Sequence, residues 1–170
     1  MSELSPPLQA QVEALASALC GRGWMLTTAE SCTGGLIAAA CTSVAGSSDW
    51  FERGFVSYSN AAKGDMLGVP AALIAAHGAV SAEVVGAMAE GALAHSTAQI
   101  ALAVTGVAGP GGGSVAKPVG TVWMAVSVKE KGKCCATQVE LLKLDGERAA
   151  VRRQTLACAL TCLLKAASSP

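Results

Sequence analysis

Apolar residues at helical spacing predict a helix at each end of the chain. The apolar positions of the first helix recur every three or four residues and share one face: Leu8, Val12, Leu15 and Leu19. Ser5 suits the N-cap, Pro6 suits the first helical position, and Gly21 or Gly23 ends the helix. The second helix covers residues 147–166 and is expected to bury a similar set: Val151, Leu156, Leu160 and Leu163.

Five short stretches between these helices have the composition of β-strands. They cover residues 24–28, 54–58, 99–105, 119–128 and 134–144. The third stretch is apolar almost throughout, which is typical of a strand covered on both faces. The last two flank the charged, glycine-containing stretch 129–133, which predicts a hairpin turn.

The segments between the strands predict helices that cover the sheet. An alanine-rich run with helical spacing covers residues 36–44, and two further helices cover residues 70–77 and 81–95. Ser59 and Asn60 can cap a short segment that carries Lys63. This order of elements favours an α/β fold, a single three-layer α/β/α domain over residues 1–170 with a mixed, mostly parallel sheet.

The junction between the first strand and the predicted helix at residues 36–44 is the most informative part of the chain. The strand stops at the turn Glu30-Ser31-Cys32-Thr33-Gly34-Gly35, and the helical run follows at once. Such a turn exposes one side chain at the sheet edge, where free helix N–H groups surround it. Ser31 is therefore a candidate nucleophile. Two alternatives stay open: Ser31 or Thr33 simply caps the helix, or Cys32, the stronger nucleophile, acts instead.

A serine nucleophile needs a base, and Lys63 is the candidate. His77 and His95 each end a predicted helix, which places neither of them well for this role. A lysine acts as a base only when neutral, which requires its environment to lower its pKa from about 10.4 to near 7, a cost of about 4 kcal/mol. The alternative is an ordinary solvated lysine. Tyr58, the only tyrosine, can orient a substrate, relay a proton or merely cover the core edge.

Two further features suit the binding of an anion. The stretch 106–113 holds five glycines, which allows several backbone N–H groups to turn toward one anion, although its order matches neither a nucleoside-triphosphate loop nor a dinucleotide site. The alternative is a mobile connector. Arg148 and Arg152 lie one turn apart on the last helix and can clamp a carboxylate or phosphate. They can equally pair with Glu147 and Asp145 at the surface.

Composition excludes several function classes. Lys and Arg balance Asp and Glu at 12 against 12, so the chain lacks the basic surface that binds nucleic acid or anionic membranes. We expect no targeting or membrane-spanning segment and hence a cytoplasmic protein. The cysteines form no Cys-x-x-Cys pair and are expected to be reduced thiols, with neither disulfides nor a metal site. They are Cys20, Cys32, Cys41, Cys134, Cys135, Cys158 and Cys162.

Several segments together resemble one family closely and in the right order. The matching motifs are Thr28-Ala29-Glu30-Ser31-Cys32-Thr33-Gly34-Gly35, Gly46-Ser47-Ser48, Trp50-Phe51-Glu52-Arg53-Gly54, Tyr58-Ser59-Asn60 with Lys63, His77-Gly78-Ala79-Val80-Ser81, Thr105-Gly106-Val107-Ala108-Gly109-Pro110, Lys117-Pro118-Val119-Gly120-Thr121-Val122, and Arg148 with Val151-Arg152. They make the chain similar to the CinA C-terminal domain family, the stand-alone nicotinamide-nucleotide amidohydrolases. In one departure, the family's Gly-Asp-Arg reads Gly146-Glu147-Arg148, which keeps the charge and the arginine.

This resemblance implies hydrolysis of nicotinamide mononucleotide to nicotinate mononucleotide and ammonia, a step that salvages pyridine nucleotide. It also implies a homodimer and a metal-free serine amidase without a cofactor. The family's catalytic serine, lysine and tyrosine fall on Ser31, Lys63 and Tyr58. The residues expected to bind the nucleotide substrate are Glu30, Thr33, Gly34, Gly35, Asn60, Thr105, Gly106, Gly109 and Arg148.

Two other function classes stay open. One is a non-catalytic nucleotide-binding or regulatory module on the same scaffold, because a fold and a pocket do not guarantee turnover. The joint presence of Ser31, Tyr58, Lys63 and Arg148 favours the enzyme. The other is a competence or DNA-repair factor, which only the name of the family suggests and which the neutral charge argues against.

Overall fold

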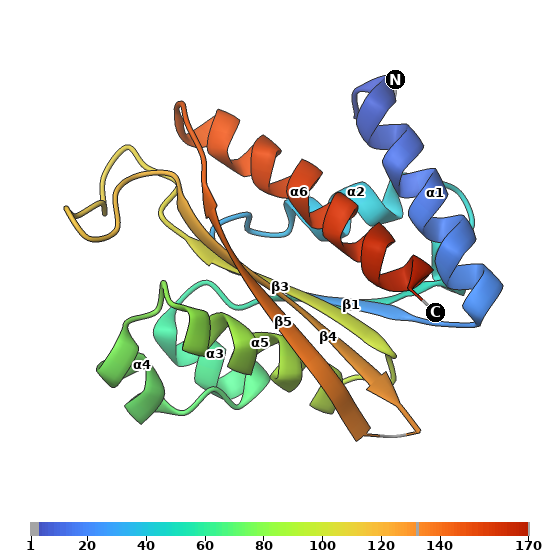
Figure 1. The fold of residues 1–170 in the computed structure, drawn as a ribbon, viewed down its shortest axis with the longest axis horizontal. Helices are drawn as coiled ribbons and strands as arrows, with labels where there is room; N and C mark the ends of the chain where they lie inside the picture. Colours follow the sequence, from blue (N-terminus) through green and yellow to red (C-terminus); the bar gives the residue numbers. More distant parts are fainter. Residues whose placement is uncertain (1–3, 132, 170) are drawn as a thin grey trace.

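The computed structural model describes residues 4–131 and 133–169. At its centre lies a five-stranded sheet with the strand order β2-β1-β3-β4-β5 (Figure 1). The strands are β1 (Leu26–Glu30), β2 (Phe51–Val56), β3 (Ile100–Gly106), β4 (Thr121–Glu130) and β5 (Lys133–Lys143). The α-helices are α1 (Pro6–Arg22), α2 (Leu36–Thr42), α3 (Asn60–Leu67), α4 (Ala71–His77), α5 (Ala82–Ala94) and α6 (Arg148–Ser168).

Four of the five strands run in the same direction. β1 pairs in parallel with β2 and β3, whereas β4 is antiparallel to both β3 and β5. The hairpin of β4 and β5 is the one predicted from the sequence, and Gly132 of its turn lies outside the described residues. The expectation of a mixed, mostly parallel sheet is confirmed.

Helices cover both faces of the sheet, as the order of elements predicted. α1, α2 and α6 lie on one face, and α3, α4 and α5 lie on the other (Figure 1). α1 packs along α6, and α5 packs on β3 and β4. A separate apolar core fills each of the two helix–sheet interfaces. The result is a three-layer α/β/α arrangement.

The core beneath α5 is built largely from small side chains, so helices and sheet approach closely. Its buried alanines are Ala29, Ala89, Ala92, Ala98, Ala101, Ala103 and Ala125. Gly91 on α5 faces the backbone of Leu67 at the end of α3, and a methyl group at Gly91 would overlap the Leu67 carbonyl oxygen. This contact sets the position of α3, the helix that carries Lys63.

Three strands are displaced from their predicted positions, and one of them, β4, begins and ends two residues later than the stretch 119–128. β1 begins and ends two residues later than the stretch 24–28, and it includes a buried Glu30 because N–H groups of the following helix satisfy that carboxylate. β2 begins at Phe51, three residues before the predicted start at Gly54. It is an edge strand, so its charged residues Glu52 and Arg53 can bond each other at the surface. Polar residues within β1 and β2 therefore concealed the boundaries of these two strands.

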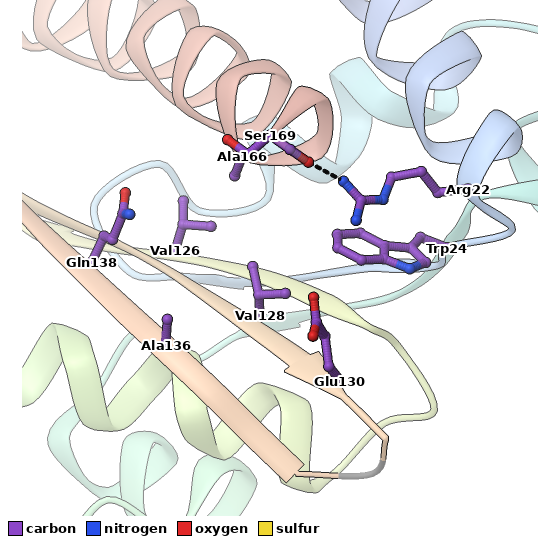
Figure 2. A pocket seen from close by; sticks show the side chains of 9 residues that line it. All are labelled: Arg22, Trp24, Val126, Val128, Glu130, Ala136, Gln138, Ala166 and Ser169. Atoms are coloured by element: carbon purple, nitrogen blue, oxygen red, sulfur yellow. Dashed lines mark hydrogen bonds between the residues drawn. The ribbon is translucent and has the colours of Figure 1, made fainter.

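Hydrogen bonds join the ends of α1 and α6 at the edge of the sheet where β1 begins. The guanidinium of Arg22 lies 3.8 Å from the ring centroid of Trp24 and donates to the carbonyl oxygens of Ala167 at 3.2 Å and Ser169 at 2.6 Å. Figure 2 shows this contact above a hollow whose floor is formed by β4 and β5. Because these bonds satisfy carbonyl groups at the end of α6, they stabilise the helix terminus.

Candidate active site

The order of the strands creates a crevice at the carboxyl end of β1. From β1 the chain crosses to β2 on one side, and it later returns to β3 on the other side. Ligands of open α/β sheets bind at such switch points, outside the carboxyl ends of the strands. Ser31 follows β1, Tyr58 follows β2, and the glycine-rich loop follows β3. Residues from three predicted motifs therefore gather at one edge of the sheet.

Ser31 and Lys63 are in direct contact at this edge. Lys63 Nζ lies 3.1 Å from Ser31 Oγ, although 32 positions separate the two residues in the sequence. The amine also donates to the backbone carbonyl oxygens of Ser57 at 3.1 Å and Tyr58 at 3.2 Å. Sequence reasoning missed these two acceptors, because they are backbone atoms that only the end of β2 brings into place.

Lys63 is buried rather than solvated. Its side chain is 1% exposed, so the interpretation as a solvated surface lysine is wrong. Burial lowers the pKa of the Lys63 amine, and a charge on the Cys32 thiol would oppose this. Among the described residues, no carboxylate lies within 4.0 Å of the amine to hold its proton. The neutral amine is thereby favoured.

Cys32 is a poorer nucleophile than its position suggested. The residue is buried, and desolvation raises the pKa of its thiol to about 11. The thiol is therefore un-ionised near neutral pH, and the thiolate is the reactive form. Because the Cys32 thiol is uncharged, it also does not raise the pKa of Lys63.

Glu30 occupies the N-terminus of α2. Its side chain is 1% exposed, and one carboxylate oxygen accepts hydrogen bonds from Thr33 Oγ1 at 2.6 Å and from the N–H groups of Gly35 and Ile37, both at 3.0 Å. The other oxygen accepts from the Ala38 N–H at 2.8 Å. The expectation that free N–H groups of this helix surround Ser31 is thus wrong for these three groups. Glu30 holds the turn, and its oxygens are engaged within the chain.

Two other N–H groups of the turn donate to no other residue that the structure describes. Among the described residues, the N–H groups of Cys32 and Thr33 have no acceptor in another residue. Gly34 and Gly35 adopt left-handed conformations, with φ of 59° and 98°, which let the chain reverse between β1 and α2. The two glycines, expected to bind substrate, have a conformational role that explains their presence here.

Arg148 joins the glycine-rich loop to the end of β2. It donates to the Gly109 carbonyl oxygen at 3.0 Å and to the Tyr58 hydroxyl at 3.2 Å. Tyr58 is 57% exposed, so its ring does not cover the core edge. Three of the residues expected from the family resemblance, Tyr58, Gly109 and Arg148, therefore form one cluster.

Arg152 lies one turn further along α6 and reaches the Ser31 turn. It donates to the Thr33 carbonyl oxygen at 2.8 Å, while its Nε is buried without a hydrogen-bond partner. Arg148 and Arg152 line an open pocket with Pro110 and Val119. The sequence indicated a shared face for the two arginines, but it did not indicate the contact of Arg152 with Thr33.

The remaining predicted residues lie around this centre. Thr105 is 1% exposed, and its hydroxyl donates to the Ala79 carbonyl oxygen at 2.9 Å, so it braces a neighbouring loop. Gly106 packs tightly against Val122. Asn60 is exposed at the start of α3, where it lines a separate hollow between α3 and α4 whose lining does not include Ser31 or Lys63.

Cysteine and metal chemistry find no further support in the described part of the chain. Five cysteines there are free thiols: Cys20, Cys32, Cys41, Cys158 and Cys162. The side chains of Cys134 and Cys135 lie outside the described residues. Across residues 4–131 and 133–169, no three His, Cys, Asp or Glu side chains cluster in a way that could hold a metal ion. Within these same limits, none of the helices has the length and apolarity needed to cross a membrane.

Comparison with known proteins gives one consistent result. The model of the CinA C-terminal domain family matches residues 8–167. The chain is 58% identical over 140 residues to the nicotinamide-nucleotide amidohydrolase PncC of Pseudomonas putida, covering 82% of this chain and 84% of that protein. It is 52% identical over 152 residues to the protein of the same name from Escherichia coli K12, covering 89% of each.

Solved structures agree with the sequence comparison. The competence/damage inducible protein CihA of Agrobacterium tumefaciens superposes with a TM-score of 0.92 and 42% identity, covering 99% of this chain and 100% of that one. A CinA superfamily protein of Klebsiella pneumoniae superposes with a TM-score of 0.88 and 37% identity, covering 95% and 98%.

Proposed function

Because this chain belongs to the CinA C-terminal domain family, we propose that it hydrolyses the carboxamide of nicotinamide mononucleotide to nicotinate mononucleotide and ammonia. Relatives about half identical to this chain carry the name nicotinamide-nucleotide amidohydrolase. The observation that carries the proposal is the 3.1 Å contact between Lys63 Nζ and Ser31 Oγ in a buried setting. A serine amidase needs such a pair, a hydroxyl nucleophile and a neutral base.

The hydrogen bonds of Lys63 suit a base better than a cation. A neutral amine has two N–H groups and one lone pair. The carbonyl oxygens of Ser57 and Tyr58 can accept the two N–H groups, which directs the lone pair toward the Ser31 hydroxyl. Ser31 then donates its proton to Lys63 as it reacts.

The reaction proceeds through an ester on Ser31. Ser31 Oγ attacks the carboxamide carbon, and its proton moves to Lys63. The C–N bond then breaks, and Lys63 returns the proton to the leaving nitrogen, which departs as ammonia. A water molecule next attacks the ester carbon and gives a proton to Lys63. When the bond to Oγ breaks, the proton returns to Ser31 and nicotinate mononucleotide leaves.

The turn after β1 supplies the donors for the developing oxyanion. The N–H groups of Cys32 and Thr33, which lack another acceptor in the described structure, are the candidates. Glu30 keeps the neighbouring N–H groups of α2 engaged, so the turn holds one shape. Arg148 and the glycine-rich loop grip the ribose or phosphate, and Tyr58 orients the substrate beside them.

The assembly and cellular role follow from the same family membership. We propose a cytoplasmic homodimer that acts in pyridine nucleotide salvage. β5 is a long edge strand with Val139 and Leu141 exposed at 41% and 39%, a surface that a second copy can cover. Sedimentation of the purified chain tests the dimer, and a monomer at micromolar concentration would contradict it.

Release of ammonia from nicotinamide mononucleotide tests the activity. The wild-type chain should release it, and a chelator should leave the rate unchanged. Ser31→Ala and Lys63→Ala should each lower the rate by about 10²-fold or more, whereas Lys165→Ala, an exposed lysine on α6, should not. A wild-type chain that binds the nucleotide without releasing ammonia would contradict the amidase and support a binding module.

A further inference from the structure

Two positive charges face one pocket without a negative partner. The pocket lies between the glycine-rich loop and the start of α6, and it is lined by Pro110, Val119, Gly146, Glu147, Arg148, Ala149 and Arg152. Glu147 is the only carboxylate of this lining, and neither arginine forms an ion pair with it or with any other described carboxylate. The alternative of surface pairing with Glu147 or Asp145 is therefore wrong.

Within the described part of the chain, both guanidinium groups donate only to neutral oxygens. Arg148 donates to the Gly109 carbonyl and the Tyr58 hydroxyl, and Arg152 donates to the Thr33 carbonyl. Arg152 is only partly exposed, and its Nε is shielded from water with no acceptor. No described carboxylate balances either charge, so an anion in the pocket would be attracted to both guanidinium groups.

The N-termini of the two helices near the site differ in how well their N–H groups are already satisfied. The carboxylate of Glu30 already occupies the N-terminus of α2, so an added anion would be repelled there. The 21-residue helix α6 begins at Arg148, and its N-cap residue Glu147 makes no side-chain cap hydrogen bond. The positive end of the α6 dipole therefore adds to the charges of the two arginines.

We propose that Arg152 determines specificity by binding the phosphate monoester of the substrate together with Arg148. This inference rests on the proposed amidase and assigns a residue to the recognition of the phosphate that its substrate carries. Arg152 also contacts the Thr33 carbonyl in the nucleophile turn. The single side chain of Arg152 thus connects the phosphate pocket with the turn that holds Ser31.

The charge of the substrate separates this role from a purely structural one. If Arg152 only held Thr33 in place, its loss would slow every carboxamide alike. If it binds the phosphate, its loss affects nicotinamide mononucleotide far more than nicotinamide riboside, which lacks the phosphate. The neighbouring Arg153 is exposed on the same helix and is the matched control.

The experiment compares kcat/KM for the two substrates in the wild type, Arg152→Gln, Arg152→Lys and Arg153→Gln. Arg152→Gln should lower the ratio of kcat/KM for the nucleotide to kcat/KM for the riboside by about 30- to 100-fold, mainly through KM for the nucleotide. Arg152→Lys should recover part of the loss, and Arg153→Gln should match the wild type. Equal losses on both substrates, or equal behaviour of Arg152→Gln and Arg153→Gln, would overturn the proposal.

Calorimetric binding to Ser31→Ala gives a second readout that needs no turnover. In that background, Arg152→Gln should weaken binding of the nucleotide by more than tenfold and leave riboside binding unchanged. An unchanged preference for the nucleotide would again overturn the role of Arg152. Failure of the amidase itself is a separate result, because it appears as a wild-type chain that releases no ammonia.

Discussion

Replacing Glu30 by glutamine removes the charge that holds the nucleophile turn. In the wild type, one oxygen accepts three hydrogen bonds, from Thr33 Oγ1 and from the N–H groups of Gly35 and Ile37, and the other accepts one from Ala38. In its better orientation, the glutamine amide keeps the first oxygen. Its NH2 group then faces the Ala38 N–H, so two donors oppose each other.

The expected cost follows from this count. One buried donor loses its acceptor, which costs about 1–3 kcal/mol, and three remaining bonds lose the strengthening that a charged acceptor gives. The side chain is 1% exposed, so water cannot replace the lost partner. We therefore expect the free energy of unfolding to fall by about 2–4 kcal/mol.

Urea unfolding measures this cost. With a slope of about 2 kcal/mol per molar, the midpoint of Glu30→Gln should fall by about 1–2 M. Glu13→Gln, which changes an exposed glutamate on α1, should leave the midpoint unchanged. The folded variant should also have a lower kcat, because the turn that carries Ser31 is held less firmly. A midpoint within about 0.3 M of the wild type would refute the role assigned to Glu30.

Three further predictions concern the core and the nucleophile. Cys32→Ala should keep ammonia release within about threefold of the wild type, because the pKa of that thiol is raised to about 11; a loss as large as that of Ser31→Ala would make Cys32 the nucleophile. Gly91→Ala should destabilise the chain by about 1–3 kcal/mol in urea, since the added methyl overlaps the Leu67 carbonyl. Gly21→Ala, with nothing within 4 Å, should instead stabilise α1 by up to about 1 kcal/mol, and equal effects at both glycines would contradict the packing argument. Burial lowers the pKa of Lys63 in the folded chain, so between that value and the ordinary lysine pKa only the unfolded chain binds the proton. Stability should therefore rise with pH across this range in the wild type, and Lys63→Met, also followed in urea, should remove this rise; the same rise in both chains would disprove it.

Local signals were sufficient to predict where most helices begin and end. Gly23 ends α1 in a left-handed conformation, and the side chains of Ser59 and Ser81 cap α3 and α5 by accepting from Ala62 and Val84. Each of these effects depends on a residue's own chemistry and on neighbours within a few positions. Such effects can therefore be read from the sequence alone.

The contacts of the site depend on strand order, which spacing does not reveal. Lys63 meets Ser31 only because β2 lies beside β1, so that the start of α3 falls next to the turn after β1. The local sequence indicated both residues as candidates but left a helix cap and a surface lysine open, and the family resemblance then favoured the catalytic roles. The role of Glu30 was hidden for a related reason, since a carboxylate at the end of a strand does not show which N–H groups the following turn will direct at it.

The pH dependence of kcat/KM for nicotinamide mononucleotide tests the central claim most directly, namely that a neutral Lys63 takes the proton of Ser31. Because burial lowers the pKa of Lys63, the wild-type rate should rise with pH and level off below the ordinary lysine value of 10.5. In Lys63→Ala the residual rate should lack this step. A wild-type rise centred at the ordinary lysine pKa, or the same step in Lys63→Ala, would contradict the account.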